Sequence, residues 1–382
     1  MTEFNYNYLN IHALISHSAS CLNRDNNNLQ KTMTFGGVKR ARISSQSLKY
    51  AIRNSRYYSK HLGEPSDRTR ELHQLCEQYV EELKDKFSPE LIRKTIGLLV
   101  GKTIEALGEE EHSAIIPWSI SEVEAVCNEV ALAEKEELNE RQLAKRLKDS
   151  SEKLHKALAS SVDIALSGRM VTSGLMEPID GAMALAHSFT THGHESQLDW
   201  FTAVDNFANR KSEMASNKAQ AGHIGTQDFA TGTFYRFCTL NLEQLTENIG
   251  GDRKKALDIA THLVYLLATV VPSGKQNSFA SFNYAEYVLC SFSDQPISLA
   301  DAFERPIQKE TGGGFMLTSI KTLQEYSKNL HESYSIDHLQ NTFSLLTSQE
   351  ESEKSDKSEK SKKVDKPTVA KLQQWVREQG IK

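Results

Sequence analysis

The 382-residue sequence predicts an α+β fold with a long helical insertion, on the basis of three observations. Apolar and polar residues alternate along Leu9–Ser16, which is typical of a strand. Helical periodicity runs from about 67 to 166 with few interruptions. Two aromatic-rich segments, Thr231–Leu242 and Phe279–Phe292, predict further strands and flank an amphipathic helix at Arg253–Val270. This order indicates that a helical domain interrupts a core that contains a sheet.

A polar loop and a helix follow the first strand. The loop contains Asn26–Asn28 and Gly36–Gly37 as turn material, and an irregular loop of this length is usually functional or disordered. Ser44 or Ser45 is expected to cap a helix that runs to about Lys60. In the insertion, breaks at Pro89, Gly108 and Pro117 divide the periodicity into helices at 67–87, 90–107, 119–137 and 140–160.

The C-terminal part has a different composition. Residues 350–366 hold six acidic and six basic residues among seventeen, with Val364 as the one apolar residue. Such a segment cannot bury enough apolar surface to order itself, so we expect a charged flexible linker. Residues 367–382 then contain a short terminal helix with Leu372, Trp375 and Val376 on one side. That helix needs a docking surface, on this chain or on a partner.

The composition indicates a soluble, cytoplasmic protein. The longest apolar stretch, Leu263–Val271, is too short to cross a bilayer, and residues 1–10 lack the basic and apolar regions of a signal peptide. The five cysteines are widely spread and contain no C-x-x-C pair. This pattern argues against a disulfide framework or a structural zinc site.

The net charge of −5 conceals a basic block. Residues 26–63 hold eight Lys or Arg and no Asp or Glu, which leaves the rest of the chain at −13. On a helical wheel, Lys49, Arg53, Arg56 and Lys60 share one face with Gln46 at its start, opposite an apolar face. Solvated faces normally mix signs, so this face favours phosphate binding over a plain surface helix. The preceding segment adds further cations at Arg24, Lys31, Lys39, Arg40 and Arg42.

Several blocks, taken in order, resemble one known family. They are SHSASCLNRD, FGGVKRARISSQSLKYAIR, VDIALSGRMVTSG, DGAMALAHSFTTH, DWFTAVD, HIGTQDFATGTFYRF and PSGKQNSFA. Together they are similar to the CasC-type backbone subunit of type I-E CRISPR Cascade complexes. The resemblance implies a modified RRM-like (ferredoxin-like) core at 1–63 and 167–345, an inserted helical domain at 64–166, and a protruding thumb hairpin at about 190–223.

The resemblance also implies a function. Subunits of this family polymerise head to tail along the spacer of a CRISPR RNA, kink it at intervals, and present it for pairing with target DNA in antiviral defence. The expected partners are the CRISPR RNA, target DNA through the guide, other copies of the chain, and the other Cascade subunits, including guide-end caps, a small subunit and a PAM-reading large subunit. No membrane partner and no cofactor are expected.

Individual residues match the RNA contacts of the family. The backbone contacts correspond to Arg24, Lys31, Ser44, Ser45, Gln46, Lys49 and Arg53, which agrees with the helical wheel. Lys39, Arg40 and Arg42, from the same basic block, are assigned to RNA binding as well. Arg169 and Met170 match a loop that touches RNA, with Met170 suited to wedge against an unstacked base. Trp200, Phe201 and Thr202 on the thumb match residues that pack beside the kink, where flat apolar surface tolerates any base. Without the resemblance, these aromatic residues would be expected to anchor a hairpin to its own core.

A second set of cations is a candidate for DNA binding. Arg141, Lys145 and Lys148 lie on one side of the helix predicted at 140–160, and in the family the helical domain faces DNA. Glu152 lies on the same side, however, and mixed signs are typical of plain solvation. Both interpretations stay open at this point.

The enzyme alternative is a metal-dependent endoribonuclease of the related type III backbone kind, with Asp25 as the candidate residue. A lone Asp does not suffice without a second carboxylate or a positioned base, and Asn26–Asn28 supply neither. We therefore expect no catalytic residues, no metal site and no enzymatic activity.

Overall fold

The computed structural model describes residues 6–101, 115–149, 157, 160–171, 176, 178–204, 221–346 and 367–380. Its centre is a nine-stranded sheet in the order β11-β10-β1-β9-β7-β3-β2, in which β6 and β8 also pair with β9. The pairings within this sheet are antiparallel, which confirms the predicted α+β class. The strands are β1 (Tyr8–Ser20), β2 (Thr32–Phe35), β3 (Val38–Ile43), β6 (Met183–Leu185), β7 (Ser188–Thr190), β8 (Gln197–Val204), β9 (Ala221–Asn241), β10 (Tyr287–Ser293) and β11 (His338–Ser344).

The connections around β1 follow a simple pattern. Strand β1 lies between β9 and β10, and β6 lies on the far side of β9. Helices α1 (Ser45–Arg53) and α2 (Arg56–Leu62) follow β1 along the chain, and α11 (Arg253–Thr269) joins β9 to β10. The predicted helix at 253–270 is thereby confirmed. Shorter elements complete this part: α8 (Val162–Ser167), α10 (Leu242–Asn248), α12 (Gln276–Phe279) and η2 (Ala300–Phe303).

Both faces of the sheet are covered. On one face Leu9, Ile11 and Ile15 of β1 share a core with apolar residues of α1 and α11. On the other face Leu14 packs in a second cluster that includes residues of α13 (Met316–Ser333). The alternation along β1 predicted the strand, but the polar positions are buried as well. His12, for example, is 1% exposed, because α13 covers that face and Tyr235 offers a hydroxyl 2.9 Å from His12 Nδ1.

The helix predicted from Ser45 to Lys60 is two helices. Asn54 ends α1, and Ser55 begins α2 as an N-cap whose Oγ accepts a hydrogen bond from the Tyr58 amide. The continuous helical wheel was therefore wrong beyond Arg53, and Arg56 and Lys60 belong to a separate helix. Ser and Asn compete locally for backbone hydrogen bonds, which is why this pair interrupts the pattern.

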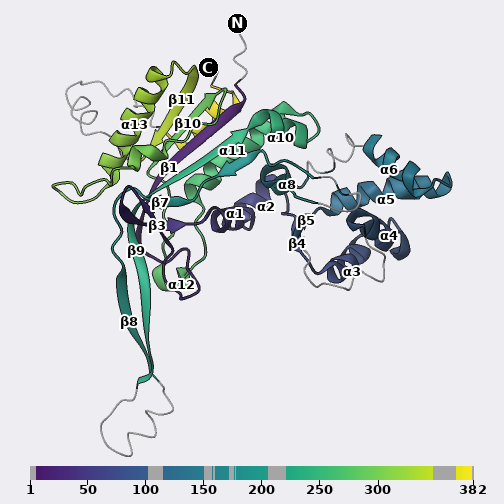
Figure 1. Ribbon diagram of the computed structural model, residues 1–382, viewed down its shortest axis with the longest axis horizontal. Coiled ribbons are helices and arrows are strands. Elements are labelled where there is room, and N and C mark those ends of the chain that lie inside the picture. The colour runs from purple at the N-terminus through teal and green to yellow at the C-terminus, as the bar shows by residue number, and fades with distance from the viewer. Residues whose placement is uncertain are drawn as a thin grey trace, which may run out of the picture.

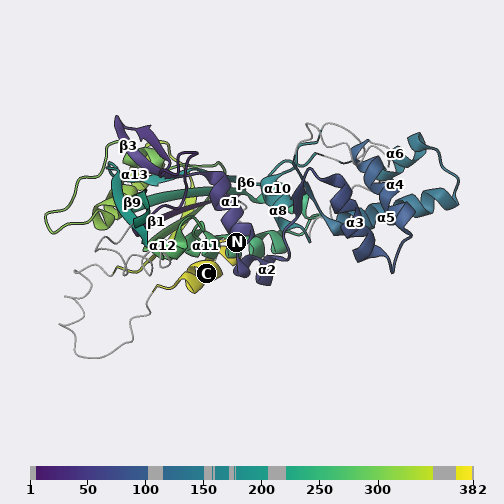
Figure 2. The ribbon, with the colours of Figure 1, turned by 90° about the horizontal axis from the view of Figure 1, so that it is seen from below.

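A group of helices with its own core lies to one side of the sheet (Figures 1 and 2). It contains α3 (Leu72–Leu83), α4 (Pro89–Val100), α5 (Ile120–Lys135) and α6 (Glu140–Asp149), packed around the fully buried Trp118. The predicted start of the first helix at 67 was wrong, because β4 (Asp67–Thr69) pairs there with β5 (Ile116–Trp118). None of the helices that the structure describes is long and apolar enough to cross a bilayer.

The terminal helix α15 (Val369–Arg377) docks on this chain. Leu372 and Val376 are buried, Trp375 packs against Phe292, and Arg377 pairs with Asp258 of α11 at 2.7 Å. This answers the question of its docking surface. The predicted charged linker at 350–366 lies outside the described residues.

Candidate nucleic-acid interface

Helix α1 is fixed at its N-terminus by side chains from three segments. The Ser44 Oγ accepts from the Ser47 amide at 3.2 Å, which makes Ser44 the N-cap. The Ser44 amide donates to Asn23 Oδ1, and the Ser45 amide donates to His187 Nδ1, both at 2.9 Å. Leu48 and Ile52 are buried against the core. The helix is therefore anchored from one side and at one end, and its remaining surface is available for other contacts.

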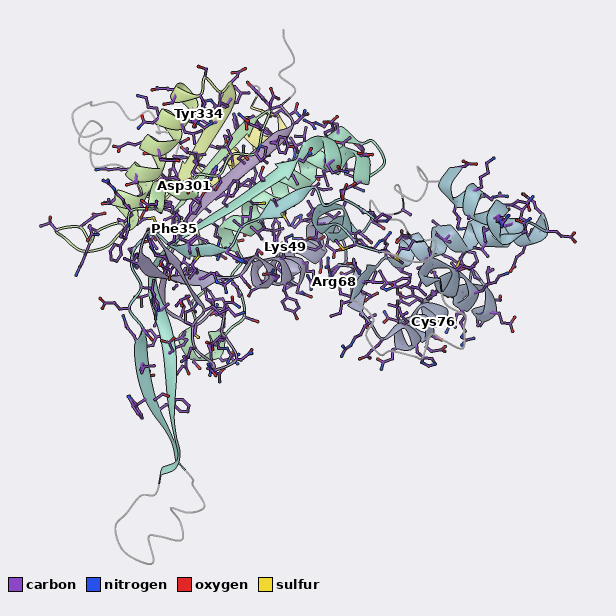
Figure 3. The ribbon with its side chains drawn as sticks, in the orientation of Figure 1. Phe35, Lys49, Arg68, Cys76, Asp301 and Tyr334 are labelled. Atoms are coloured by element: carbon purple, nitrogen blue, oxygen red, sulfur yellow. The ribbon has the colours of Figure 1, made fainter. Side chains whose placement is uncertain are left out.

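Three cations converge beside α1. Lys49 and Arg53 are half-buried one turn apart, and Arg68 comes from β4, as Figure 3 shows for the labelled Lys49 and Arg68. Burial lowers the pKa of Lys49 and of Arg53, and the nearby charge of Arg68 lowers both further. Arg68 Nη2 pairs with Asp163 Oδ2 at 3.1 Å. The sequence analysis missed Arg68, since it lies outside the basic block and next to an aspartate, so no local signal marked it.

The segment between β1 and β2 is an ordered turn, where the sequence predicted an irregular loop. Asp25 Oδ1 accepts hydrogen bonds from the Asn27 and Leu29 amides, and Arg24 Nη1 donates to Asn28 Oδ1 at 2.5 Å. A cleft of about 350 Å³ separates this turn from α1 and from residues 272–274. A side chain at Gly274 would meet the Cys21 and Leu22 carbonyl oxygens at 2.7 Å, so glycine lets that wall approach closely.

The geometry of Asp25 fits a structural role. Its carboxylate organises the turn, and in the part of the chain that the structure describes no three His, Cys, Asp or Glu side chains gather as a group that could hold a metal ion. The endoribonuclease alternative gains no support from this arrangement.

Arg40 does not belong to the exposed basic set. Its side chain is buried and donates to the carbonyl oxygens of Phe35, Thr190, Phe303 and Glu304 at 2.9–3.3 Å. The assignment of Arg40 to RNA binding was therefore wrong, because a guanidinium enclosed by four carbonyl groups cannot also reach a phosphate.

The neighbouring cations differ from Arg40. Lys39 is exposed and lines a second cavity of about 530 Å³ at the base of the β8–β9 hairpin. Lys31 and Arg42 are half-buried and lie close enough to His187 for their charges to lower the pKa of its imidazole. These three, together with Arg24, stay candidates for phosphate contact.

The loop after α8 contains two predicted RNA contacts, Arg169 and Met170, and the structure places them in different surroundings. Arg169 is buried and forms a bidentate ion pair with Glu122, with N–O distances of 2.6 and 2.7 Å. Its predicted RNA contact is wrong, because the side chain is buried and Glu122 occupies both terminal nitrogens of the guanidinium. Met170, the next residue, is 87% exposed. Arg169 thus fixes the loop, through this pair and a backbone bridge to Ile179, and Met170 projects from it.

The β8–β9 hairpin projects far from the sheet (Figure 1). Trp200 is 71% and Leu198 57% exposed, and both lie on one face because side chains alternate along a strand. Phe201 lies on the opposite face over Gly225, where a Cβ would approach its ring to 2.6 Å. Trp200 and Phe201, which were predicted to act as a pair, therefore lie on opposite faces of the hairpin. The side chain of Thr202 lies outside the described residues.

Helix α6 carries the candidate DNA-binding cations. Leu143 and Leu147 are buried. Arg141 and Lys145 are exposed and make no hydrogen bond or ion pair with any described residue, whereas Arg146 between them pairs with Glu129 and Glu136. The side chain of Lys148 lies outside the described residues.

Comparisons with known proteins agree with this picture. The family model described as "CT1975-like protein" matches residues 9–375. One solved chain, described as "CRISPR RNA-guided surveillance complex, pre-nicking", is 26% identical with a TM-score of 0.71, and the match covers 98% of this chain and 100% of that chain. A second, described as "CRISPR RNA-guided surveillance complex", is 23% identical with a TM-score of 0.53 over 89% of this chain and 90% of that chain, and supports the fold alone. The comparison with curated proteins finds no match. The chain therefore belongs to the CT1975-like family, the CasC-type backbone subunits of type I-E CRISPR Cascade complexes.

Proposed function

We propose that this chain is the subunit that binds CRISPR RNA and polymerises along its spacer in a Cascade complex, where it presents the guide for pairing with target DNA. The observation that carries the proposal is the convergence of cations around α1, in a segment with no acidic residue between 26 and 63. A solved chain with 26% identity over nearly the full length, from an RNA-guided surveillance complex, supports it. The role is binding and assembly, without catalysis.

In this proposal the chain binds the guide RNA by electrostatic attraction. Lys49 and Arg53 on α1, with Gln46 at its start, face phosphates of the RNA backbone, and Arg24, Lys31 and Arg42 extend the contact from the adjoining segments. Ser44 and Ser45 hold the helix end in place by their hydrogen bonds. Contacts of this kind position the strand and carry no sequence information, which suits a protein that must accept any guide.

The hairpin and the loop at Met170 provide apolar surface for displaced bases. Trp200 and Met170 are strongly exposed apolar side chains, and Trp200 shares its face of the hairpin with the exposed Leu198. A base can stack on Trp200 without hydrogen bonds to its edges, so the contact tolerates every base. We assign the hairpin the role of the thumb, which kinks the RNA held by a neighbouring copy.

The proposed architecture follows from the chain order. With β10, β1, β9 and β6 side by side and helices joining them, the core is a modified RRM-like fold at 1–63 and 167–345, interrupted by the helical domain at 64–166. Head-to-tail copies whose rotation does not close into a ring form an open filament, and guide length and capping subunits then set the number of copies.

The helical domain would face target DNA through α6. Arg141 and Lys145 have no partner among the described residues, in contrast to Arg146. Charge reversal at both should reduce the salt dependence of DNA binding by the assembled complex. An unchanged salt dependence would remove DNA binding from the proposal and leave RNA binding intact.

The main experiment is to co-express the chain with its partner subunits and a CRISPR array and to extract the nucleic acid that copurifies. We expect discrete, guide-sized RNA, which the double variant Lys49→Glu/Arg53→Glu loses. Lys84→Glu/Lys86→Glu, at exposed positions of the helical group, serves as the charge-matched control and should retain the RNA. Wild-type protein free of RNA, with all partners present, would refute the proposal.

A further inference from the structure

We propose that His187 is a further RNA-binding residue, whose Nε2–H donates a hydrogen bond to the guide backbone beside Lys31 and Arg42. The inference rests on the proposed function and adds a residue that the basic block does not contain. His187 lies in the short connection between β6 and β7, 142 residues from its partner on α1.

The backbone contact fixes the tautomer of His187. The Ser45 amide donates to Nδ1 at 2.9 Å, and a backbone N–H can only donate, so Nδ1 carries no proton. In the neutral imidazole the proton then resides on Nε2, which makes that atom a donor. The side chain therefore accepts a bond from the first turn of α1 and offers a donor on the opposite side of its ring. The partial positive charge at the N-terminus of α1 polarises the imidazole through this bond and so strengthens Nε2–H as a donor.

The surroundings of His187 favour a neutral ring and an anionic partner. Strand pairing sets Ile43 opposite Ser188 and Arg42 opposite Phe189, which places His187 beside the start of α1. Ser188 and Phe189 are buried, whereas His187 is exposed. Burial, followed by the charges of Arg42 and Lys31, lowers the pKa of His187, so the ring stays uncharged at neutral pH. A donor between two cations, with no acidic residue in the adjoining segment 26–63, fits a phosphate or ribose oxygen of a passing strand.

Two substitutions of similar shape distinguish the roles of Nδ1 and Nε2. His187→Asn places an amide oxygen where Nδ1 lies and removes the Nε2 donor, whereas His187→Gln places an amide group at the Nε2 position and leaves the Ser45 amide without its acceptor. Affinity is measured by anisotropy of the full-length chain with fluorescein-labelled single-stranded RNA. His73→Asn, at an exposed position of α3, is the matched control.

We expect His187→Asn to melt at the wild-type temperature and to bind RNA about tenfold more weakly, and His187→Gln to bind more tightly than His187→Asn. RNA affinity of His187→Asn within twofold of wild type would overturn the inference. If Lys49→Glu/Arg53→Glu also loses RNA in that case, the proposed function stands without His187. If the wild-type chain binds no RNA alone, and no RNA copurifies with it when all partner subunits are present, both fall.

A second measurement does not depend on either variant. Nitrogen-15 spectra of the histidine rings should show His187 protonated on Nε2, and that resonance should shift when RNA is added. A ring protonated on Nδ1, or a resonance that RNA leaves unmoved, would contradict the assignment.

Discussion

Arg40 and Arg42 lie two residues apart on β3, and the structure gives them opposite roles. The sequence assigns both to RNA, whereas the structure encloses Arg40 among four carbonyl groups and leaves Arg42 half-buried near Lys31. Replacement of each by methionine, which keeps much of the apolar stem, therefore tests the assignment with a matched pair.

The expected cost of Arg40→Met follows from its contacts. The guanidinium holds the β2–β3 turn and the backbone at 190 to residues 303 and 304, and its removal leaves several buried carbonyl groups unsatisfied. Each such loss costs about 1–3 kcal/mol, partly offset because a buried charge disappears, so we expect a net loss of about 3 kcal/mol in the free energy of unfolding. With an unfolding entropy of about 0.8 kcal/mol/K for a chain of this length, the melting temperature falls by about 4 °C.

The assay measures thermal unfolding by circular dichroism and RNA affinity by anisotropy on the same samples. Arg40→Met should lower the melting temperature and keep RNA affinity within about twofold at a temperature where both proteins are folded. Arg42→Met should leave the melting temperature almost unchanged and weaken RNA binding, with a shallower salt dependence. If Arg40→Met melted like wild type and lost RNA, the argument from burial would be refuted.

Four further predictions concern other parts of the molecule. Arg169→Met leaves Glu122 buried without its cation, so the free energy of unfolding, measured by urea titration, should fall by about 3–5 kcal/mol. The double variant Arg169→Met/Glu122→Leu should recover most of this loss. Truncation after Gln349 removes α15 and its buried Leu372 and Val376, so the melting temperature should fall; a truncated chain as stable as the full one would contradict the docking. Lys49→Ala should reduce the slope of log affinity against log salt by about one. Burial lowers the pKa of His12 to about 3, so between pH 6.5 and 3 the unfolded chain takes up a proton at this residue that the native chain does not. The free energy of unfolding should therefore fall with decreasing pH, by about 1.4 kcal/mol per pH unit. The substitution His12→Asn should flatten this pH dependence.

Local patterns predicted much of the fold because the forces involved are local. The alternation in β1 and the periodicity of α11 reflect burial against one neighbour, and the structure has both elements close to the predicted positions. The break at Asn54–Ser55 was missed, since an apolar stripe continues across it into α2. The burial of the polar side of β1 was also beyond reach, because α13 lies about 300 residues further along the chain.

The basic block predicted the location of the candidate site, but not which cations serve it. A count of charges treats Arg40 and Arg42 alike. The carbonyl groups that distinguish Arg40 include those of residues 190, 303 and 304, which lie 150 to 264 positions away. The same holds for Arg169, whose carboxylate partner is 47 residues distant. Conversely, Arg68 and His187 join the site through the fold, and nothing in their own neighbourhood marks them. A site made by long-range packing can be located from sequence, while its membership requires the structure.

The electrostatics around α1 favour the binding of an anion such as the proposed RNA backbone. Lys49, Arg53 and Arg68 lie together with Asp163 as the one carboxylate paired to any of them among the described residues, and burial already disfavours the charged forms of Lys49 and Arg53. The folded chain thus carries a repulsion that the unfolded chain, with its cations far apart in water, does not. A phosphate that enters relieves this repulsion, and it does so without rearrangement because α1 is anchored by Ser44, Asn23 and His187. Fixed cations bind more tightly than mobile ones, since the cost of ordering them has been met on folding. If the guide binds at this cluster as proposed, it offsets the repulsion that lowers the stability of the free subunit, and the assembled state is then favoured over the isolated chain.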